Sequence, residues 1–342
     1  MSWKPVLYEY VRSANQREAD YGLPETSVLV TDRHYRDLEQ QRLKRLRARH
    51  AERGAKPVGN DTALKLRNVR EFDRTVIADI DLRRKAHLRT RGVEHTEERV
   101  DRERITLSQS AGGNWNVTRV ESIVPERTQI SGTPAVFSAS PETVSVYAGT
   151  QAQSVPYLNE RVMRRSNPPG RERAYLYDRE AAKAYADRHW NEPSTQYIHF
   201  DVDCTNYVSQ CLYAGGAPMN YTGKREMGWW YKGKSGGREL WSFSWSVAHA
   251  LQRLLYGSRA VGLRAQLMNE ARELTIGDVI CYDFDGDGRF EHSTIVTGAD
   301  GAGEPLVNAH TTNSKARFWD YQDSYAWTER TQYRFFRIQE SF

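Results

Sequence analysis

The first 55 residues place their apolar positions at helical spacing. Within residues 31–54 the apolar stripe consists of Tyr35, Leu38, Leu43 and Leu46. Thr31 or Asp32 can cap the start of this helix, and Gly54 can end it. Charged residues fill the other positions, so the pattern predicts a helical beginning with a solvated, arginine-rich face.

Residues 62–124 change to an alternation of polar and apolar positions, as in RTVIADIDL and NWNVTRVESIV. This period is typical of half-buried strands, and Gly112–Trp115 marks a hairpin turn. We expect residues 1–124 to form an α+β domain in which an antiparallel meander packs on helices. That arrangement loosely resembles the nuclear-transport-factor-like fold, and we expect a binding or positioning role for it.

Residues 125–170 have the composition of a linker, rich in Ser, Pro and Gly. Two runs inside it, VFSAS and TVSVY, could dock as short strands. The linker predicts a boundary between residues 1–124 and a second domain.

Residues 171–342 begin with helical patterns and end with strand-like runs. Asp178 can cap a helix that reaches about Trp190, and Ser242 or Ser244 can cap another that ends at Gly257. The strand-like runs are DVICYDF, EHSTIVTG, EPLVNAHT and QYRFFRI. Helices followed by an antiparallel sheet predict a second α+β domain.

The overall charge permits several partners. A net charge of +5 could suit anionic polymers, with the basic N-terminal domain as the contact surface. No basic run is interleaved with stacking aromatics, so nucleic acid is not favoured. The start, MSWKPVLYEYVRSANQREADYG, lacks an apolar core of signal-peptide length, and no stretch is apolar enough to span a membrane. We expect a cytoplasmic protein or one exported without a conventional leader.

The stretch DVDCTNYVSQCLYAGG contains two of the three cysteines. Val208, Cys211 and Leu212 follow Cys204 at helical spacing, which places Cys204 in the first turn of a helix. The seven-residue separation of Cys204 and Cys211 corresponds to about 10 Å along a helix, too far for a disulfide. A helix N-terminus favours a reactive thiolate, but the same position also suits a buried, inert cysteine.

Two later strands supply polar partners for such a thiol. His292 begins the run HSTIVTG and could point toward the helix that carries Cys204. Asn308 and His310 share one face of the next strand, and either could hold an imidazole in one tautomer. A cysteine, a histidine and a polar orienting residue, in this order, have the logic of a thiol-hydrolase triad.

At these motifs the chain resembles a known family. The runs DCTNYVSQCLYAGGAPM, ELTIGDVICYDFDGDGRFEHSTIVTG and NAHTTN are similar to the putative amidase domain family, related to the CHAP and NlpC-type branch of papain-like cysteine hydrolases. The resemblance covers about residues 171–340 and implies a papain-like fold. It implies Cys204 as nucleophile, His292 as general base, and His310 or else Asn308 as the third residue.

Several neighbours are expected to support this chemistry. Asp203 would brace the loop or the start of the helix rather than take part in proton transfer, because a carboxylate beside a thiolate opposes ionisation of the thiol. The backbone N–H of Cys204 could donate to an oxyanion, with Asn191 or Tyr197 as a second donor. Trp229, Trp230 and Trp245 could line a substrate groove or equally pack in a core.

The implied reaction is hydrolysis of an amide bond through an acyl-thioester, without a metal or organic cofactor. Relatives of this type often cut peptidoglycan, so a wall-derived peptide is the expected substrate. The alternative is a non-catalytic peptide- or glycan-binding protein on the same fold. A weaker alternative is a calcium site at Asp283, Asp285 and Asp287 in DFDGDG, where position twelve is Thr294 instead of the usual Glu.

Overall fold

The computed structural model describes residues 2–22, 29–127, 176–235, 238–257 and 262–342. The predicted linker at 125–170, with its VFSAS and TVSVY runs, lies almost entirely outside these residues. The contacts divide the chain into two compact units. Unit 1 contains residues 1–124, 299–306 and 312–329, and unit 2 contains the rest. Both units mix helices with antiparallel strands, so the prediction of an α+β fold is confirmed.

Two helices open unit 1, as the apolar spacing predicts. They are α1 (Lys4–Asp20) and α2 (Arg33–Arg53). The Asp32 side chain accepts a hydrogen bond from the N–H of Tyr35, and Gly54 ends α2 in the left-handed conformation at φ 66°. Both predicted ends of α2 are therefore confirmed.

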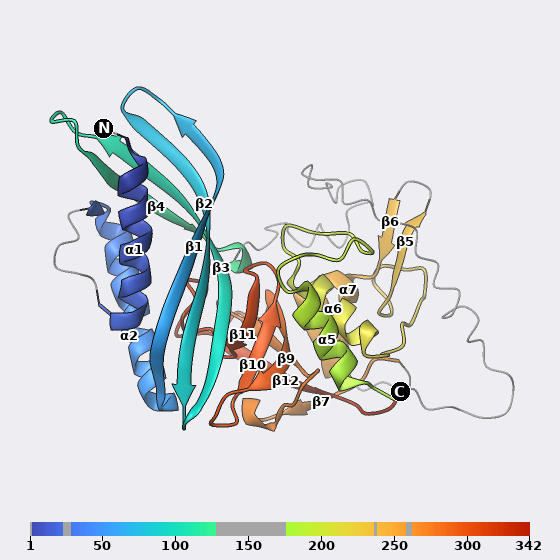
Figure 1. The fold of residues 1–342 in the computed structure, drawn as a ribbon. Helices are drawn as coiled ribbons and strands as arrows, with labels where there is room; N and C mark the ends of the chain where they lie inside the picture. Colours follow the sequence, from blue (N-terminus) through green and yellow to red (C-terminus); the bar gives the residue numbers. More distant parts are fainter. Residues whose placement is uncertain (1, 23–28, 128–175, 236–237, 258–261) are drawn as a thin grey trace, which may run out of the picture. The chain divides into compact units, whose positions relative to one another are not determined.

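The strands of unit 1 form an antiparallel sheet, and Figure 1 shows α1 and α2 lying along it. They are β1 (Ala55–Glu71), β2 (Thr75–Thr90), β3 (Val93–Gln109), β4 (Trp115–Ile123) and, from late in the chain, β11 (Ser314–Phe318). The predicted turn at Gly112–Trp115 connects β3 to β4. Alternate residues of β2 and β3 join the side chains of α1 and α2 in a buried core.

Unit 2 contributes the helices α5 (Arg179–His189), α6 (Cys204–Ala214), α7 (Phe243–Ser246) and α8 (Ala248–Tyr256). Asp178 caps α5 as predicted, by accepting a hydrogen bond from the N–H of Ala181. The single helix predicted between Ser242 and Gly257 is wrong. The backbone of Val247 is extended, at φ −117° and ψ 122°, and separates α7 from α8.

The sheet of unit 2 contains β7 (Ala265–Met268), β8 (Val279–Asp283), β9 (His292–Ala299), β10 (Pro305–Ala309) and β12 (Gln332–Ile338). Their order is β10-β9-β8-β12-β7, and the first half of β10 is counted with unit 1. A separate hairpin pairs β5 (Tyr231–Ser235) with β6 (Arg238–Trp241). Short 3₁₀ turns occupy Pro125–Arg127 and Ala271–Glu273.

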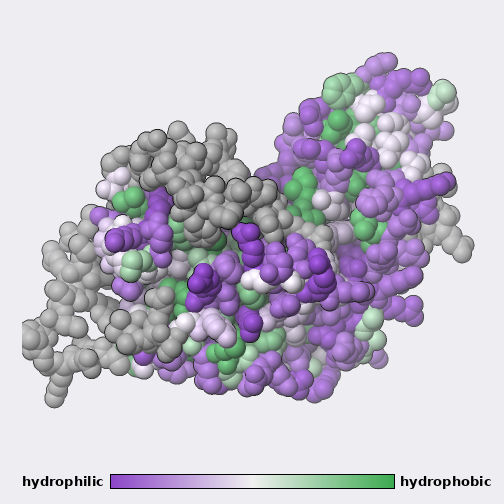
Figure 2. Space-filling model, turned by 180° about the vertical axis from the view of Figure 1, so that it is seen from behind, coloured by the Kyte–Doolittle hydropathy of each residue, from purple (hydrophilic) through white to green (hydrophobic). Residues whose placement is uncertain are grey.

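The face of the molecule seen in Figure 2 is mostly hydrophilic, with scattered apolar side chains. Among the described residues, no helix is both long enough and apolar enough to cross a membrane.

Candidate functional site

Cys204 is the first residue of α6 and is only 3% exposed. Its Sγ lies 3.8 Å from the backbone oxygen of Glu291 and 3.7 Å from Thr205 Oγ1. Burial raises the pKa of this thiol, while hydrogen bonds from Thr205, the Ser293 backbone and Thr311 act in the lowering direction. The resting thiol is thus protonated and shielded.

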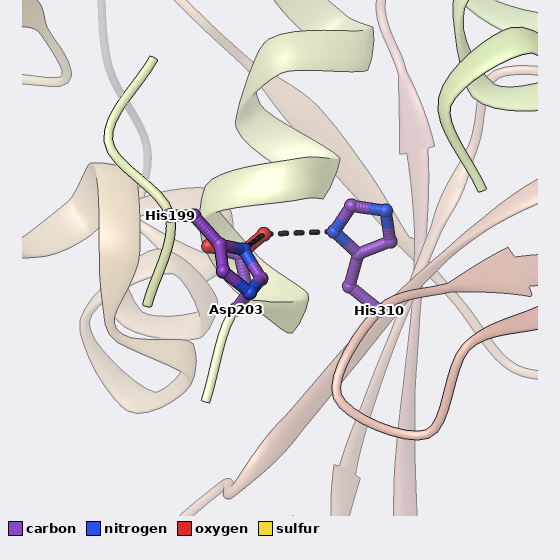
Figure 3. A group of neighbouring side chains, drawn as sticks. All are labelled: His199, Asp203 and His310. Carbon is purple, nitrogen blue, oxygen red and sulfur yellow. Dashed lines mark hydrogen bonds and ion pairs between the residues drawn. The ribbon is translucent and has the colours of Figure 1, made fainter. Parts of the chain in front are cut away.

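Asp203 precedes Cys204 and connects α6 to its surroundings. Its carboxylate accepts hydrogen bonds from the backbone N–H of Phe200 at 3.0 Å and from Asn206 Nδ2 at 2.8 Å. The other oxygen, Oδ2, lies 2.7 Å from His310 Nδ1 and 3.4 Å from His199 Nδ1 (Figure 3). Burial opposes the charge of Asp203, but the two histidines outweigh it and lower its pKa to about 2.

Of the two candidate third residues, His310 is the one that contacts the start of α6, through Asp203. Its Nδ1 faces Asp203, its Nε2 lies 2.6 Å from the backbone oxygen of His189, and the Tyr207 ring stacks on it at 4.0 Å. Both ring nitrogens of His310 thus face oxygen atoms. Asn308 instead donates to Asp187 of α5 and accepts from Thr297.

His292 begins β9 and is completely buried. Its ring lies against Tyr282, at 5.5 Å between centroids, and against Phe284 at 6.1 Å. The next residue, Ser293, places its hydroxyl 3.3 Å from Thr205 of α6. Side chains of neighbouring strand residues point to opposite faces of the sheet, so Ser293 faces α6 and His292 faces the other way. The expected orientation of His292 toward α6 is therefore not the one observed.

The backbone N–H groups at the start of α6 share one acceptor. Thr311 Oγ1 accepts from the N–H of Asp203 at 3.0 Å and from the N–H of Cys204 at 3.1 Å. Because the Asp203 side chain is engaged elsewhere, it makes no capping bond to α6. Thr311 therefore satisfies donors that a helix start leaves open.

The remaining predicted residues are mostly packed. Trp229, Trp230 and Trp245 are buried at 1%, 2% and 0% exposure, which favours the core interpretation over a groove. Tyr197 stacks on Trp245 with 5.9 Å between ring centroids. Asn191 is half-buried just after α5.

Two groups of side chains in the described parts of the chain have metal-ligand chemistry. The first is His199, Asp203 and His310, in which both nitrogens of His310 already face oxygen acceptors. The second is Asp283, Asp287 and Glu291. The Asp283 carboxylate accepts from the N–H groups of Gly286, Asp287 and Gly288. These bonds support the turn-forming role of DFDGDG.

Sequence reasoning missed His199 and Thr311. Thr311 directly follows His310 in NAHTTN, so its position next to a candidate residue was the available signal. His199 lies in a loop and follows no periodic pattern, so only the three-dimensional structure brings it to Asp203.

The fold and site define an α+β protein with a cysteine at the start of a helix and an Asp–His pair beside it. Residues 176–336 match the family model described as a putative amidase domain, which confirms the family resemblance of this region. The description of that family names an amidase reaction.

Two proteins of Bacillus subtilis (strain 168) are similar to parts of the chain. "Uncharacterized protein YhbB" is 51% identical over 166 residues, which are 48% of this chain and 51% of that protein. "Uncharacterized protein YjcM" is 28% identical over 146 residues, 40% of this chain and 31% of that protein. The chain thus spans about half the length of the first relative and about a third of the second. The intermembrane space region of chloroplast protein ARC6 aligns with 36% of this chain and 97% of its own, at 14% identity and a TM-score of 0.22.

Proposed function

We propose that the protein is a cysteine-dependent amidase or peptidase with Cys204 as its nucleophile. The observation that carries the proposal is the placement of Cys204 at the first turn of α6, against the start of β9 and next to the Asp203–His310 pair. The match of residues 176–336 to an amidase family supports the reaction class. A papain-like arrangement of helix and sheet belongs to the same proposal.

In the proposed reaction, the general base takes the proton of the Cys204 thiol while Sγ attacks the carbonyl carbon of an amide, and the carbonyl electron pair moves to the oxygen. Collapse of this intermediate expels the amine, which takes a proton from the general base. Water then hydrolyses the thioester and restores the thiol. Every step uses side chains and water alone.

His292 is the proposed base, on the strength of its position in the family motif. Its ring packs on Tyr282 and Phe284 in the resting structure, so catalysis requires the start of β9 to turn the ring toward Sγ. His310, fixed between Asp203 and His189, is proposed to hold the start of α6 in place. His292→Ala should therefore abolish turnover, and His310→Ala should weaken it.

The proposed substrate is a peptide from peptidoglycan or a related isopeptide. The test is digestion of purified peptidoglycan and free muropeptides followed by mass spectrometry, with Cys204→Ala as the control. Release of new amine and carboxyl ends by the wild type alone supports the proposal. Equal product patterns for both proteins would contradict it.

A second candidate is a peptide- or glycan-binding protein without catalysis, and the burial of both Cys204 and His292 favours it. Iodoacetamide labelling distinguishes the candidates. Burial raises the pKa of Cys211 well above the ordinary value and that of Cys281 to about 12. A catalytic Cys204 should react first at pH ~8, whereas slow and equal labelling of all three favours the binding protein.

Unit 1 is proposed to bind or position a partner, with an anionic polymer as the candidate ligand. Part of the positive charge of unit 1 is neutralised inside the unit, because Arg42 and Arg53 are buried in ion pairs with carboxylates. The exposed arginines and lysines are left for such a contact.

A further inference from the structure

The hydroxyl of Thr311 occupies a position where two backbone donors converge beside the proposed nucleophile. The N–H groups of Asp203 and Cys204 lie 3.0 Å and 3.1 Å from this single oxygen. An acyl-transfer enzyme uses such a pair of converging donors to hold an oxyanion, and the oxygen must sit about 2.7–3.1 Å from them. Thr311 Oγ1 meets that distance criterion without any substrate.

The backbone of Thr311 supplies an independent reason to regard this position as special. Its φ is 83°, in the left-handed region that β-branched residues rarely adopt. Such conformations persist only where the surroundings enforce them. Here the enforcing contacts are the two N–H groups that hold the hydroxyl, and this residue is directly joined to His310.

The hydroxyl has no spare acceptor capacity in this state. Its two lone pairs receive the two N–H groups, and a hydroxyl has only one proton to give. A hydrogen bond from Thr311 is among the interactions that favour the ionised Cys204. These hydrogen bonds together hold the Thr311 hydroxyl between the two N–H groups.

We propose that Thr311 Oγ1 fills the oxyanion position of the resting site and must leave it when a substrate carbonyl arrives. The inference rests on the proposed function of Cys204 as an acyl-transfer nucleophile. When Sγ bonds to the carbonyl carbon, the displaced electron pair becomes an oxyanion that needs the Asp203 and Cys204 N–H groups. Thr311 is a positioning residue that keeps the resting site closed.

The test compares two reactions of Cys204 in the full chain. 4-Nitrophenyl acetate acylates the thiol: the S–C bond forms, an oxyanion develops, and 4-nitrophenolate leaves while the thiol proton passes to base. Iodoacetamide alkylates the same thiol by displacing iodide, without an oxyanion. Both rates depend on the exposure and ionisation of the thiol, and only the acylation rate depends on the oxyanion position. The ratio of the two rates therefore reports on the oxyanion position alone.

Thr311→Gly removes the hydroxyl and accepts a positive φ without strain. We expect it to raise the acylation-to-alkylation ratio by about threefold to tenfold, because the carbonyl oxygen no longer competes with a hydrogen-bonded hydroxyl. Thr311→Ala should raise the ratio as well, and Thr311→Ser, which keeps the hydroxyl, should stay within about twofold of the wild type. Ala316→Gly is the matched control, since Ala316 also has a positive φ, at 49°, in the other unit.

An unchanged or lowered ratio in both Thr311→Gly and Thr311→Ala would overturn the inference and assign the hydroxyl to support of α6 alone. Failure of the proposed function gives a different result. Cys204 would then react with neither reagent faster than Cys211 and Cys281 do, in the wild type and in every variant.

Discussion

At the scale of single residues, Asp203 joins the largest number of partners in the site. Its two oxygens contact the Phe200 N–H, Asn206, His199 and His310. A buried carboxylate with this many donors stays ionised, and the charge is part of what holds His310 beside α6. The residue predicted only as a brace is therefore the centre of the polar network.

Asp203→Asn should lower the free energy of unfolding by about 2 kcal/mol at pH 7, since the shift of its pKa from 3.8 to about 2 corresponds to that amount. The folded pKa is the lower one, so the stabilisation is complete above about pH 4 and disappears as the pH falls through 2. Urea unfolding at pH 7 and pH 3 measures the difference. Asp201→Asn, at an exposed position two residues away, is the control. Equal stability of the two variants at pH 7 would contradict the role of Asp203.

At the scale of elements, Gly215 sets the spacing between α6 and the start of α5. A Cβ at this position would lie 2.5 Å from the Tyr177 ring and 2.9 Å from the backbone oxygen of Asp178. Gly215→Ala should lower the melting temperature through a loss of about 1–3 kcal/mol. Gly298→Ala is the matched control, because a Cβ there meets nothing within 4 Å. If both variants melt together, the packing of α5 on α6 does not depend on this glycine.

The loop between β8 and β9 makes stability depend on pH through Glu291. Burial raises the pKa of Glu291 to about 7, with the charges of Asp283, Asp287 and Asp285 adding to the effect against a hydrogen bond from the Phe284 N–H. The ionised form is disfavoured in the fold, so stability declines as the pH rises from about 4.5 to 7.

Glu291→Gln should remove this decline and raise the free energy of unfolding at pH 8 by about 1 kcal/mol, a value discounted for solvent screening of a half-exposed group. At pH 4 the variant and the wild type should be equal. Urea unfolding at both pH values provides the measurement, and Glu192→Gln, at an exposed position, is the control. A gain of the same size at pH 4 and pH 8 would trace the effect to packing rather than charge.

The elements show where sequence patterns suffice. Segments such as α2, β3 and β4 could be predicted from their capping residues, their alternation and their turn, because local side chains decide them. The break at Val247 between α7 and α8 could not, since the apolar spacing continues across it. The same holds for His292: strand alternation was readable, but which face α6 covers depends on tertiary packing.

At the scale of the whole molecule, unit 1 is completed by two segments from the C-terminal half of the sequence, residues 299–306 and 312–329. Arg53 at the end of α2 is buried and pairs with Asp300 at 3.2 Å and with Glu97 at 3.1 Å. Arg99 of β3 pairs with Asp323. The sequence places residues 299–329 in the C-terminal half, and no local pattern could indicate that their carboxylates neutralise arginines of the N-terminal half.

Asp300→Asn should therefore destabilise unit 1, although residue 300 lies in the C-terminal half of the sequence. The asparagine oxygen can still accept the N–H groups of Ala302 and Glu304, so the turn is retained while Arg53 loses one of its two carboxylates. Breaking a buried ion pair typically costs about 3–5 kcal/mol, and the remaining Glu97 should reduce this to about 2 kcal/mol.

Hydrogen exchange followed by mass spectrometry locates the effect. Faster exchange is expected in α2 and in β2 and β3, with α6 of unit 2 unchanged. Glu329→Gln, an exposed position in the same late segment of unit 1, controls for the loss of one negative charge. If exchange accelerates only within residues 176–298, the late segment stabilises its own half of the sequence instead. The arginines of α2 and β3 would then tolerate the loss of their carboxylate partners in residues 299–329, and these partners would not contribute to the stability of unit 1.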